Sequence, residues 1–312
     1  MDEVLRIIPK SIREYLEIDV KQQTVNIEEI RLRVGKPVEI VRTKSDIDRQ
    51  IKTTKPPIFT DKEASMMMAS ISQHSMYRLE EELRRGYITI AGGHRVGIAG
   101  RVVVEKGEVK GLREIGSFNI RIAKEKKGVS DPYLMDVCKN GIWMNTLIVG
   151  PPKTGKTTLL RDLARQISQG IPRKNIPARN VAIIDERSEI AGCVNGIPQH
   201  QFGMKVDVLD ACPKAEGMMM MIRSMSPDVL IVDEIGREDD AKALMEAVYA
   251  GVSVISTVHG SSLMEVKQRP TIKKLFDQGA FETVIELTAV GRRANCKRVV
   301  RPAETLNNVV RT

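Results

Sequence analysis

The segment Gly150–Thr157 constrains the fold more than any other part of the chain, because its sequence, GPPKTGKT, fits the pattern G-x-x-x-x-G-K-[ST]. The apolar run TLIVG leads into the segment, and the helically spaced run TTLLRDLARQIS follows it. A strand that turns through glycines into a helix directs backbone N–H groups and the positive end of the helix toward one point. The segment therefore predicts a phosphate-binding loop in an α/β domain.

Within this loop the residue types have separate expected roles. The ammonium group of Lys156 reaches the β- and γ-phosphates of a nucleotide, and the hydroxyl of Thr157 ligates Mg²⁺. The backbone of the loop surrounds the phosphates, so the expected nucleotide-binding residues are Gly150, Pro151, Pro152, Lys153, Thr154, Gly155, Lys156, Thr157 and Thr158.

Three more short apolar runs follow the loop and predict further central strands. They read NVAIIDE (180–186), DVLIVDE (228–234) and VSVISTV (252–258). Their apolar residues are continuous rather than alternating, which is typical of parallel strands buried on both faces. With helical runs between some of them, they predict a doubly wound α/β core with a mainly parallel sheet. We expect the C-terminal run FETVIELTAVGRRANCKRVVRPAE to supply closing antiparallel strands.

Two carboxylates follow the apolar run 229–232 directly, at the strand end where open α/β sheets bind ligands. We expect Asp233 to hold the Mg²⁺ shell and Glu234 to orient or deprotonate the attacking water. The alternative is that the two carboxylates only solvate the end of the strand. The phosphate loop upstream argues against this interpretation. The adjacent carboxylates favour ATP over GTP, and the sequence has no N-K-x-D guanine motif. The expected cofactors are therefore ATP and Mg²⁺.

Between these motifs lies a second acidic segment, AIIDERSEIAG (182–192), which carries Asp185, Glu186 and Glu189 after an apolar run. Carboxylates beside a metal–nucleotide site are costly unless a metal, a water molecule or an arginine engages them. On spacing alone, a charged loop with Arg187 as its local partner is a fair interpretation.

The N-terminal part of the chain predicts a smaller α+β domain. Residues 27–42 alternate in the manner of a hairpin, and residues 61–85 predict one amphipathic helix with Asp61 as its N-cap. Residues 86–123 read as short strands broken by glycines.

A composition change marks the expected domain boundary. The segment KEKKGVSDP (124–132) is charged, contains a glycine and ends at a proline, so it is the best candidate for a linker. We therefore expect an N-terminal α+β domain with its linker over residues 1–128 and a nucleotide-binding domain over residues 129–312.

Composition limits the partners. The net charge is +9, but the basic residues are spread along the chain and aromatic residues make up only 4%. Proteins that bind single strands use aromatic rings for stacking, so the composition argues against nucleic acid as a partner. The four cysteines lie far apart and form neither a zinc ribbon nor a redox pair. No apolar stretch is long enough to span a bilayer, so we expect a cytosolic protein.

Taken in order, GPPKTGKTT, IIDERSEI, PDVLIVDEIGRED and GVSVISTVHGSS resemble the motifs of the secretion-superfamily ATPases. These proteins are the hexameric motors of type II and type IV secretion and of pilus assembly and retraction. Their motifs are a Walker A loop, an acidic Asp box, a Walker B strand and a His box. The resemblance implies a RecA-like P-loop ATPase core, with a mainly parallel sheet, preceded by the smaller α+β domain.

The resemblance also implies roles for individual residues. It makes Glu234 the Walker B glutamate and puts Glu186 or Glu189 in the Asp box, with Glu186 the closer match. A lone histidine after a strand is usually a packing or surface residue. Here His259 matches the His-box histidine, which senses the γ-phosphate side of the site. An imidazole in that position can donate to phosphate or to the Walker B glutamate.

In that superfamily the N-terminal domain lends arginines to the nucleotide, so the resemblance makes Arg95, Arg101 and Arg121 candidates to complete the phosphate shell. A planar guanidinium offsets charge in the transition state of phosphoryl transfer. Arginines on exposed strands are ordinarily solubilising. The resemblance further implies a homohexamer that docks on membrane proteins, so the chain would lie in the cytoplasm, peripheral at the membrane.

The chain departs from the superfamily in three places. Asp233 stands where most relatives have glycine, and EIGRE replaces the usual EIRD, which shifts Arg237. Only about 50 residues follow His259, so the helical C-terminal domain of the larger motors is nearly absent.

Two other functions stay open at this point. A RecA-like motor that acts on nucleic acid would use the same core and the positive net charge, and its affinity would fall steeply with salt. A nucleotide-dependent scaffold with little turnover would use ATP to order the ring while its partners do the work.

Overall fold

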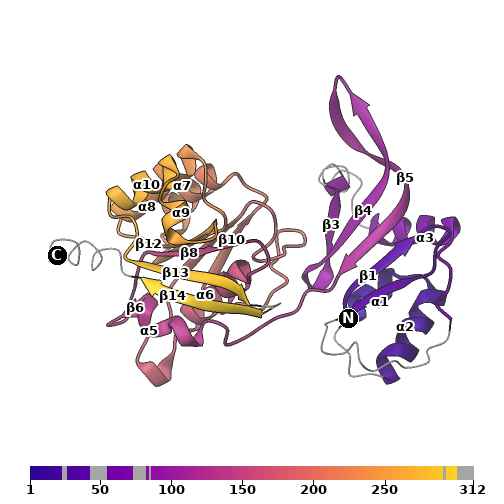
Figure 1. Ribbon diagram of the computed structural model, residues 1–312, viewed down its shortest axis with the longest axis horizontal. Helices are drawn as coiled ribbons and strands as arrows, with labels where there is room; N and C mark the ends of the chain where they lie inside the picture. The colour runs from indigo at the N-terminus through magenta and orange to yellow at the C-terminus, as the bar shows by residue number, and fades with distance from the viewer. Residues whose placement is uncertain (23–26, 43–54, 73–81, 84–85, 291–292, 301–312) are drawn as a thin grey trace. The chain divides into compact units, whose positions relative to one another are not determined.

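The computed structural model describes residues 1–22, 27–42, 55–72, 82–83, 86–290 and 293–300 (Figure 1). Its contacts divide the chain into two units, Met1–Lys124 and Glu125–Thr312, which we call unit 1 and unit 2. Each unit has a hydrophobic core of its own and is described by itself.

Unit 1 is a five-stranded antiparallel sheet with the strand order β2-β1-β5-β4-β3. Alternate strand residues such as Ile30, Val96 and Phe118 point into the core, where they meet the helix residues Ile12 and Met67. The elements are α1 (Asp2–Ile7), α2 (Lys10–Gln22), β1 (Ile27–Arg33), β2 (Glu39–Arg42), α3 (Asp61–Ser72), β3 (Tyr87–Ile90), β4 (His94–Glu105) and β5 (Glu108–Arg121).

The predicted hairpin over residues 27–42 is present as β1 and β2. The prediction of short strands broken by glycines holds for β3, which ends at the turn Ala91–Gly93, but it is wrong for β4 and β5, which form one long hairpin that continues past the other strands (Figure 1). Gly100 lies at a bulge in β4, and a Cβ on it would come within 2.6 Å of the Arg113 carbonyl oxygen. This glycine permits a close approach between the strands instead of ending one.

The helix predicted from residue 61 begins where expected, but its cap is Thr60 and not Asp61. The Thr60 hydroxyl accepts the Glu63 N–H at 3.3 Å, and the Glu63 carboxylate accepts the Thr60 N–H at 2.8 Å. This reciprocal pair is a capping box. Apart from 82–83, the part of the predicted helix beyond Ser72 lies outside the described residues.

Unit 2 is built on a seven-stranded sheet with the order β10-β9-β11-β12-β8-β13-β14. Its strands are parallel except β14, which pairs antiparallel with β13. Two-stranded β6–β7 lies beside it. The elements are α5 (Leu134–Val137), β6 (Cys138–Lys139), β7 (Ile142–Trp143), β8 (Thr146–Gly150), α6 (Lys156–Gln169), β9 (Val181–Asp185), β10 (Val206–Asp210), α7 (Lys214–Met225), β11 (Val229–Val232), α8 (Glu238–Tyr249), β12 (Ser253–His259), α9 (Leu263–Val266), α10 (Pro270–Asp277), β13 (Thr283–Val290) and β14 (Arg293–Val300).

Two hydrophobic clusters cover the two faces of this sheet. Helices α7 to α10 pack on one face and α5 and α6 on the other, as Figure 1 shows. Strands β8, β9 and β11 are buried along their whole length, which agrees with their continuous apolar sequences. Met218 and Met221 on α7 belong to the first cluster, whereas Met220 is 53% exposed.

The expectation for the C-terminal strands is half right. Strand β14 is antiparallel as predicted, but β13 joins β8 in parallel and extends the core sheet. Helices α9 and α10 form the crossover that carries the chain from β12 past β8 to β13, so that β13 can run parallel to β8. Within the described ranges, every helix is too short or too polar to serve as a membrane span.

Candidate active site

The strand order brings the polar strand ends together. Strands β9, β11, β12 and β8 are consecutive neighbours, so their carboxyl ends lie along one edge of the sheet. The register puts His259 opposite Gly150, and Val232 opposite Ser256. The residues that follow β8, β9 and β11 therefore face the same region as the end of β12.

The phosphate loop has the backbone that its glycines allow. Gly155 has φ +89°, a conformation that side chains other than glycine rarely adopt, and it precedes α6 directly. A Cβ on Gly150 would lie 2.7 Å from the Thr154 hydroxyl. Both glycines are needed for the loop to fold back over the end of β8.

Lys156 lies inside this loop and is 5% exposed. Its ammonium donates to the carbonyl oxygens of Gly150 and Pro151 at 2.8 and 3.0 Å. It also lies 2.8 Å from His259 Nδ1. Burial lowers the pKa of Lys156, and the charges of Asp233 and Glu234 oppose that shift. The ammonium is therefore held at the mouth of the loop with acidic groups nearby.

Asp233 connects the phosphate loop with β12. Its Oδ2 accepts the Thr157 hydroxyl at 3.0 Å, and its Oδ1 accepts the hydroxyl of Thr257. The Thr257 hydroxyl also accepts the Glu234 N–H at 2.9 Å. Thr257 is fully buried, so this hydroxyl fixes both carboxylate residues at the end of β11.

The pair Thr157 and Asp233 fits a Mg²⁺ ion. Adjacent ligands of an octahedral Mg²⁺ lie about 2.9 Å apart, since each metal–oxygen bond is about 2.0–2.1 Å long. The 3.0 Å between the two oxygens matches this spacing. Among the described residues no cluster of three or more His, Cys, Asp or Glu side chains could form a metal cage. Mg²⁺ commonly uses one or two protein ligands together with phosphates and water, so the pair is sufficient.

Glu234 is held from two sides. His259 Nε2 contacts Oε1, and Arg187 Nη1 lies 3.2 Å from Oε2. A lysine ammonium can only donate, so His259 Nδ1 is the acceptor of the contact with Lys156, and Nε2 is the ring nitrogen that faces Glu234. The backbone of Glu234 has φ +50°, a left-handed conformation that costs energy for a residue other than glycine.

The loop after β9 is fastened by its first carboxylate. Asp185 is 2% exposed, and it accepts the backbone N–H groups of Glu189, Ile190 and Ala191 at 2.7, 3.0 and 2.8 Å. Burial raises the pKa of Asp185 to about 6, although the three hydrogen bonds act to lower it. On α6, Arg161 donates to the carbonyl oxygens of residues 189 and 190.

The side chains of this loop enclose a hollow beside the strand ends. Its lining includes Glu186, Arg187 and Glu189 together with Asp233 and Glu234. Glu186 is paired with Lys214 of α7 at 2.5 Å, so its charge is compensated locally. The carboxylates of the acidic loop therefore lie beside Asp233 and Glu234 at the strand ends.

Most of the predicted site residues lie together in unit 2. Lys156, Thr157, Asp233, Glu234 and His259 form one linked set of polar contacts. Glu186 and Glu189 line the adjoining hollow.

The three predicted arginines belong to unit 1, and their contacts there are local. The guanidinium of Arg95 lies 4.0 Å from the centre of the Tyr87 ring. Arg101 pairs with Glu114 at 3.5 Å, and Arg121 pairs with Glu29 at 3.6 Å. Their role toward a nucleotide stays a prediction.

Sequence reasoning missed two residues that complete this constellation. Thr257 has no motif role of its own, but it shares one face of β12 with His259 because side chains alternate along a strand. Lys214 carries no motif, and its partner Glu186 lies far from it in the sequence. The sequence also gave no sign that Arg187 pairs with Glu234, which the structure shows at 3.2 Å.

The sequence profile of a protein family described as "Sporulation stage III, protein AA" matches residues 1–301. The chain belongs to this family. It is 53% identical over 288 residues to "Stage III sporulation protein AA" of Bacillus subtilis (strain 168), which covers 92% of this chain and 91% of that protein.

Two solved structures share the fold of this family member. One is the ATPase DotB of Legionella pneumophila, with a TM-score of 0.62 and 16% identity over 98% of this chain and 84% of that chain. The other is the pilus retraction motor PilT with bound ADP, with a TM-score of 0.62 and 16% identity over 95% and 85%. The predicted resemblance to secretion ATPases is confirmed. The predicted fold, a P-loop core that follows an α+β domain along the chain, is confirmed as well.

Proposed function

We propose that this protein is an ATP-hydrolysing motor of the secretion type, which assembles as a hexamer and energises a membrane channel between mother cell and forespore during endospore formation. The observation that carries the proposal is the convergence of Lys156, the Thr157–Asp233 pair and the Glu234–His259 pair at one edge of the sheet. These residues come from the ends of three neighbouring strands, β8, β11 and β12, and together they provide the groups that ATP hydrolysis needs.

The phosphate loop would bind the triphosphate. Its backbone N–H groups would hold the phosphates at the N-terminus of α6, and Lys156 would exchange its two carbonyl acceptors for phosphate oxygens. Thr157 and Asp233 would hold Mg²⁺. Bound there, the metal neutralises charge on the β- and γ-phosphates.

Glu234 would orient the attacking water and take its proton. Both of its carboxylate oxygens are engaged, one by His259 and the other by Arg187. Release of the His259 contact would free Oε1 to take the proton of the attacking water. His259 can then donate its Nε2–H to the γ-phosphate, while its Nδ1 stays close to Lys156.

Resemblance supports the rest of the proposal. The chain would act on the mother-cell side, peripheral at the membrane, through contacts with small membrane proteins of the same channel. Arginines 95, 101 and 121 of unit 1 are the candidates to complete the phosphate shell. Single-particle imaging with and without ATP tests the assembly by the presence of a six-fold ring.

Purified protein tests the chemistry. We expect Lys156→Ala to lose nucleotide binding and turnover, while Glu234→Gln keeps binding and loses turnover by at least ~100-fold. Two exposed residues on α8 provide matched controls, Lys242→Ala and Glu246→Gln, which should leave both quantities unchanged. Wild-type turnover in Glu234→Gln would show that the catalytic assignment is wrong. Stimulation of turnover by single-stranded DNA or RNA would favour the nucleic-acid motor instead.

A further inference from the structure

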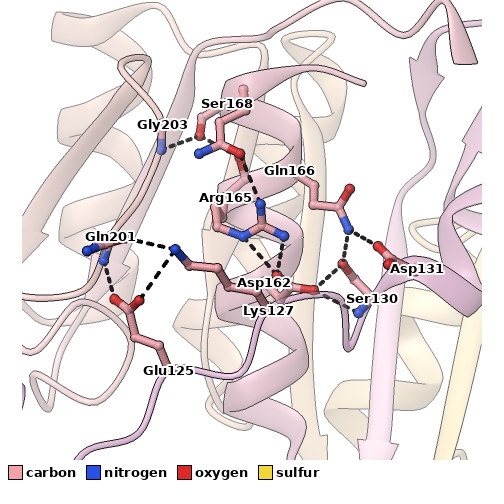
Figure 2. Close-up of polar contacts among 11 residues, drawn as sticks. Glu125, Lys127, Ser130, Asp131, Asp162, Arg165, Gln166, Ser168, Gln201 and Gly203 are labelled. Carbon is pink, nitrogen blue, oxygen red and sulfur yellow. Dashed lines mark hydrogen bonds and ion pairs between the residues drawn. The ribbon is translucent and has the colours of Figure 1, made fainter. Parts of the chain in front are cut away.

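The segment Glu125–Asp131, which we call the connecting arm, links the two units and is anchored on helix α6 of unit 2 (Figure 2). Ser130 is fully buried, and both its N–H and its hydroxyl donate to Asp162 Oδ2, at 2.9 and 2.7 Å. Gln166 donates to the Ser130 hydroxyl at 2.8 Å and to Asp131 Oδ1 at 2.5 Å. The end of the arm is therefore bonded to two successive turns of α6.

The central acceptor of this cluster, Asp162, is itself fixed. Its side chain is 1% exposed, and the guanidinium of Arg165 donates twice to its Oδ1, at 2.9 and 2.6 Å. Burial acts to raise the pKa of Asp162, but the hydrogen bonds from Ser130 and Arg165 outweigh it and lower the pKa. The carboxylate is thus ionised and engaged on both oxygens, and charge-assisted hydrogen bonds are the stronger kind.

The beginning of the arm is anchored as well. Glu125 accepts the backbone N–H of Gln201 at 2.6 Å, and Lys127 donates to the Gln201 side-chain oxygen at 2.8 Å (Figure 2). Between the two ends, Val129 packs against the hydrophobic cluster under α6. All these contacts stay within unit 2.

On the other side of the boundary, the chain is held by unit 1. The Ala123 N–H donates to Nδ1 of His94 at 2.9 Å. Burial lowers the pKa of His94, which keeps the ring neutral and its Nδ1 able to accept. Only Lys124 lies between this last anchor of unit 1 and Glu125, the first anchor of unit 2.

Gly128, the glycine of the predicted linker, allows a tight turn within the connecting arm and does not make the arm flexible. Gly128 has φ +80°, and a Cβ on it would lie 3.0 Å from Asp131 Oδ2. The Asp131 N–H donates to the Gly128 carbonyl oxygen at 3.3 Å, which closes a turn. The boundary between the two units falls within the predicted linker, and residues 125–131 of that segment are bound to unit 2.

We propose that Lys124 is the pivot between the two units, and that the connecting arm moves with α6 as part of unit 2. Relative motion of units joined by a single chain crossing is the ordinary expectation. Helix α6 begins at Lys156 within the phosphate loop, so a displacement of that helix reaches the pivot through the arm directly. The proposal concerns how the chain moves and holds whether or not the protein hydrolyses ATP.

Two insertions of Gly-Gly-Ser in the full-length protein distinguish pivot from arm. The fluorescence of Trp143, the one tryptophan of the chain, reports unfolding of unit 2. The insertion after Lys124 should leave the urea midpoint unchanged. The insertion after Gly128 should lower the folding equilibrium constant by at least ~10-fold, because it separates the two anchored ends. Equal effects of the two insertions, or a larger effect after Lys124, would overturn the proposal.

Hydrogen exchange provides a measurement on the unaltered protein. After correction for intrinsic rates, the Ser130 amide should exchange at least ~10-fold more slowly than the Lys124 amide. Asp162→Asn should speed exchange of the Ser130 amide by at least ~10-fold. Asp228→Asn is the matched control, since Asp228 also accepts a backbone N–H in unit 2, and it should not change this rate. An unprotected Ser130 amide in the wild type, or equal effects of both variants, would contradict a fixed arm.

Discussion

Replacing Asp185 by asparagine tests how the acidic loop beside the active site is held. This carboxylate is 2% exposed and accepts three backbone N–H groups of the loop that follows β9. Asparagine has nearly the same shape but carries no titratable proton in this range. The variant therefore removes the pH dependence that Asp185 contributes to stability while it keeps one acceptor for the loop.

The magnitude follows from the raised pKa. Burial raises the pKa of Asp185 from 3.8 to about 6, and the nearby charge of Asp210 adds to the increase. The folded state then holds this proton more tightly than the unfolded chain. The resulting stabilisation is complete below the unfolded pKa and is lost as the pH rises through 6. The total loss is about 3 kcal/mol, of which about 1.3 kcal/mol falls between pH 5 and pH 7.

Urea unfolding at pH 5 and pH 7, followed by Trp143 fluorescence, measures this difference. We expect the free energy of unfolding of the wild type to fall by about 1.3 kcal/mol more than that of Asp185→Asn over this interval. The other titrating groups are present in both proteins, so their effects cancel in the comparison. The same pH dependence in both proteins would refute the conclusion that burial raises the pKa of Asp185 in the folded state.

Three further predictions concern the active site. Arg187→Ala should lower kcat for ATP by roughly 10-fold and leave KM within about 2-fold, which steady-state kinetics measures. Arg187→Lys should recover most of the activity in the same assay, because either cation can hold the Glu234 carboxylate. Thr257→Val keeps the shape of a fully buried side chain but removes the hydroxyl shared by Asp233 and Glu234. It should lower the free energy of unfolding by about 1–3 kcal/mol in the same urea assay. Chelation of Mg²⁺ by EDTA should weaken ATP binding by at least ~10-fold in a titration with fluorescent ATP, and Thr157→Val should reduce this metal dependence.

Much of the nucleotide-binding unit was predictable because its signals are local. The phosphate loop requires glycines, a lysine and a threonine at set spacings, and continuous apolar runs mark strands buried on both faces. Strands β8, β9, β11 and β12 all lie where such runs occur. The neighbouring edge strand β10 was missed, because VDVLD is short and only half-buried.

The errors concern pairings between distant parts of the chain. Glycines in β4 and β5 resemble strand breaks in the sequence, although at Gly100 the missing side chain lets two long strands approach. The direction of β13 depends on a crossover through α9 and α10 and not on its own residues. Gly128 has the composition of a flexible linker but lies in an anchored turn.

The sequence by itself determined the phosphate loop, the central strands and the acidic and histidine residues at their ends, because hydrogen-bond geometry and burial on both faces leave few choices for such segments. Only the tertiary structure decided that Arg187 faces Glu234, that Thr257 joins Asp233 to Glu234, and that the connecting arm is bound to α6. These contacts join residues that are far apart in the chain. Whether such side chains meet depends on strand order and register, which no local pattern of residues records.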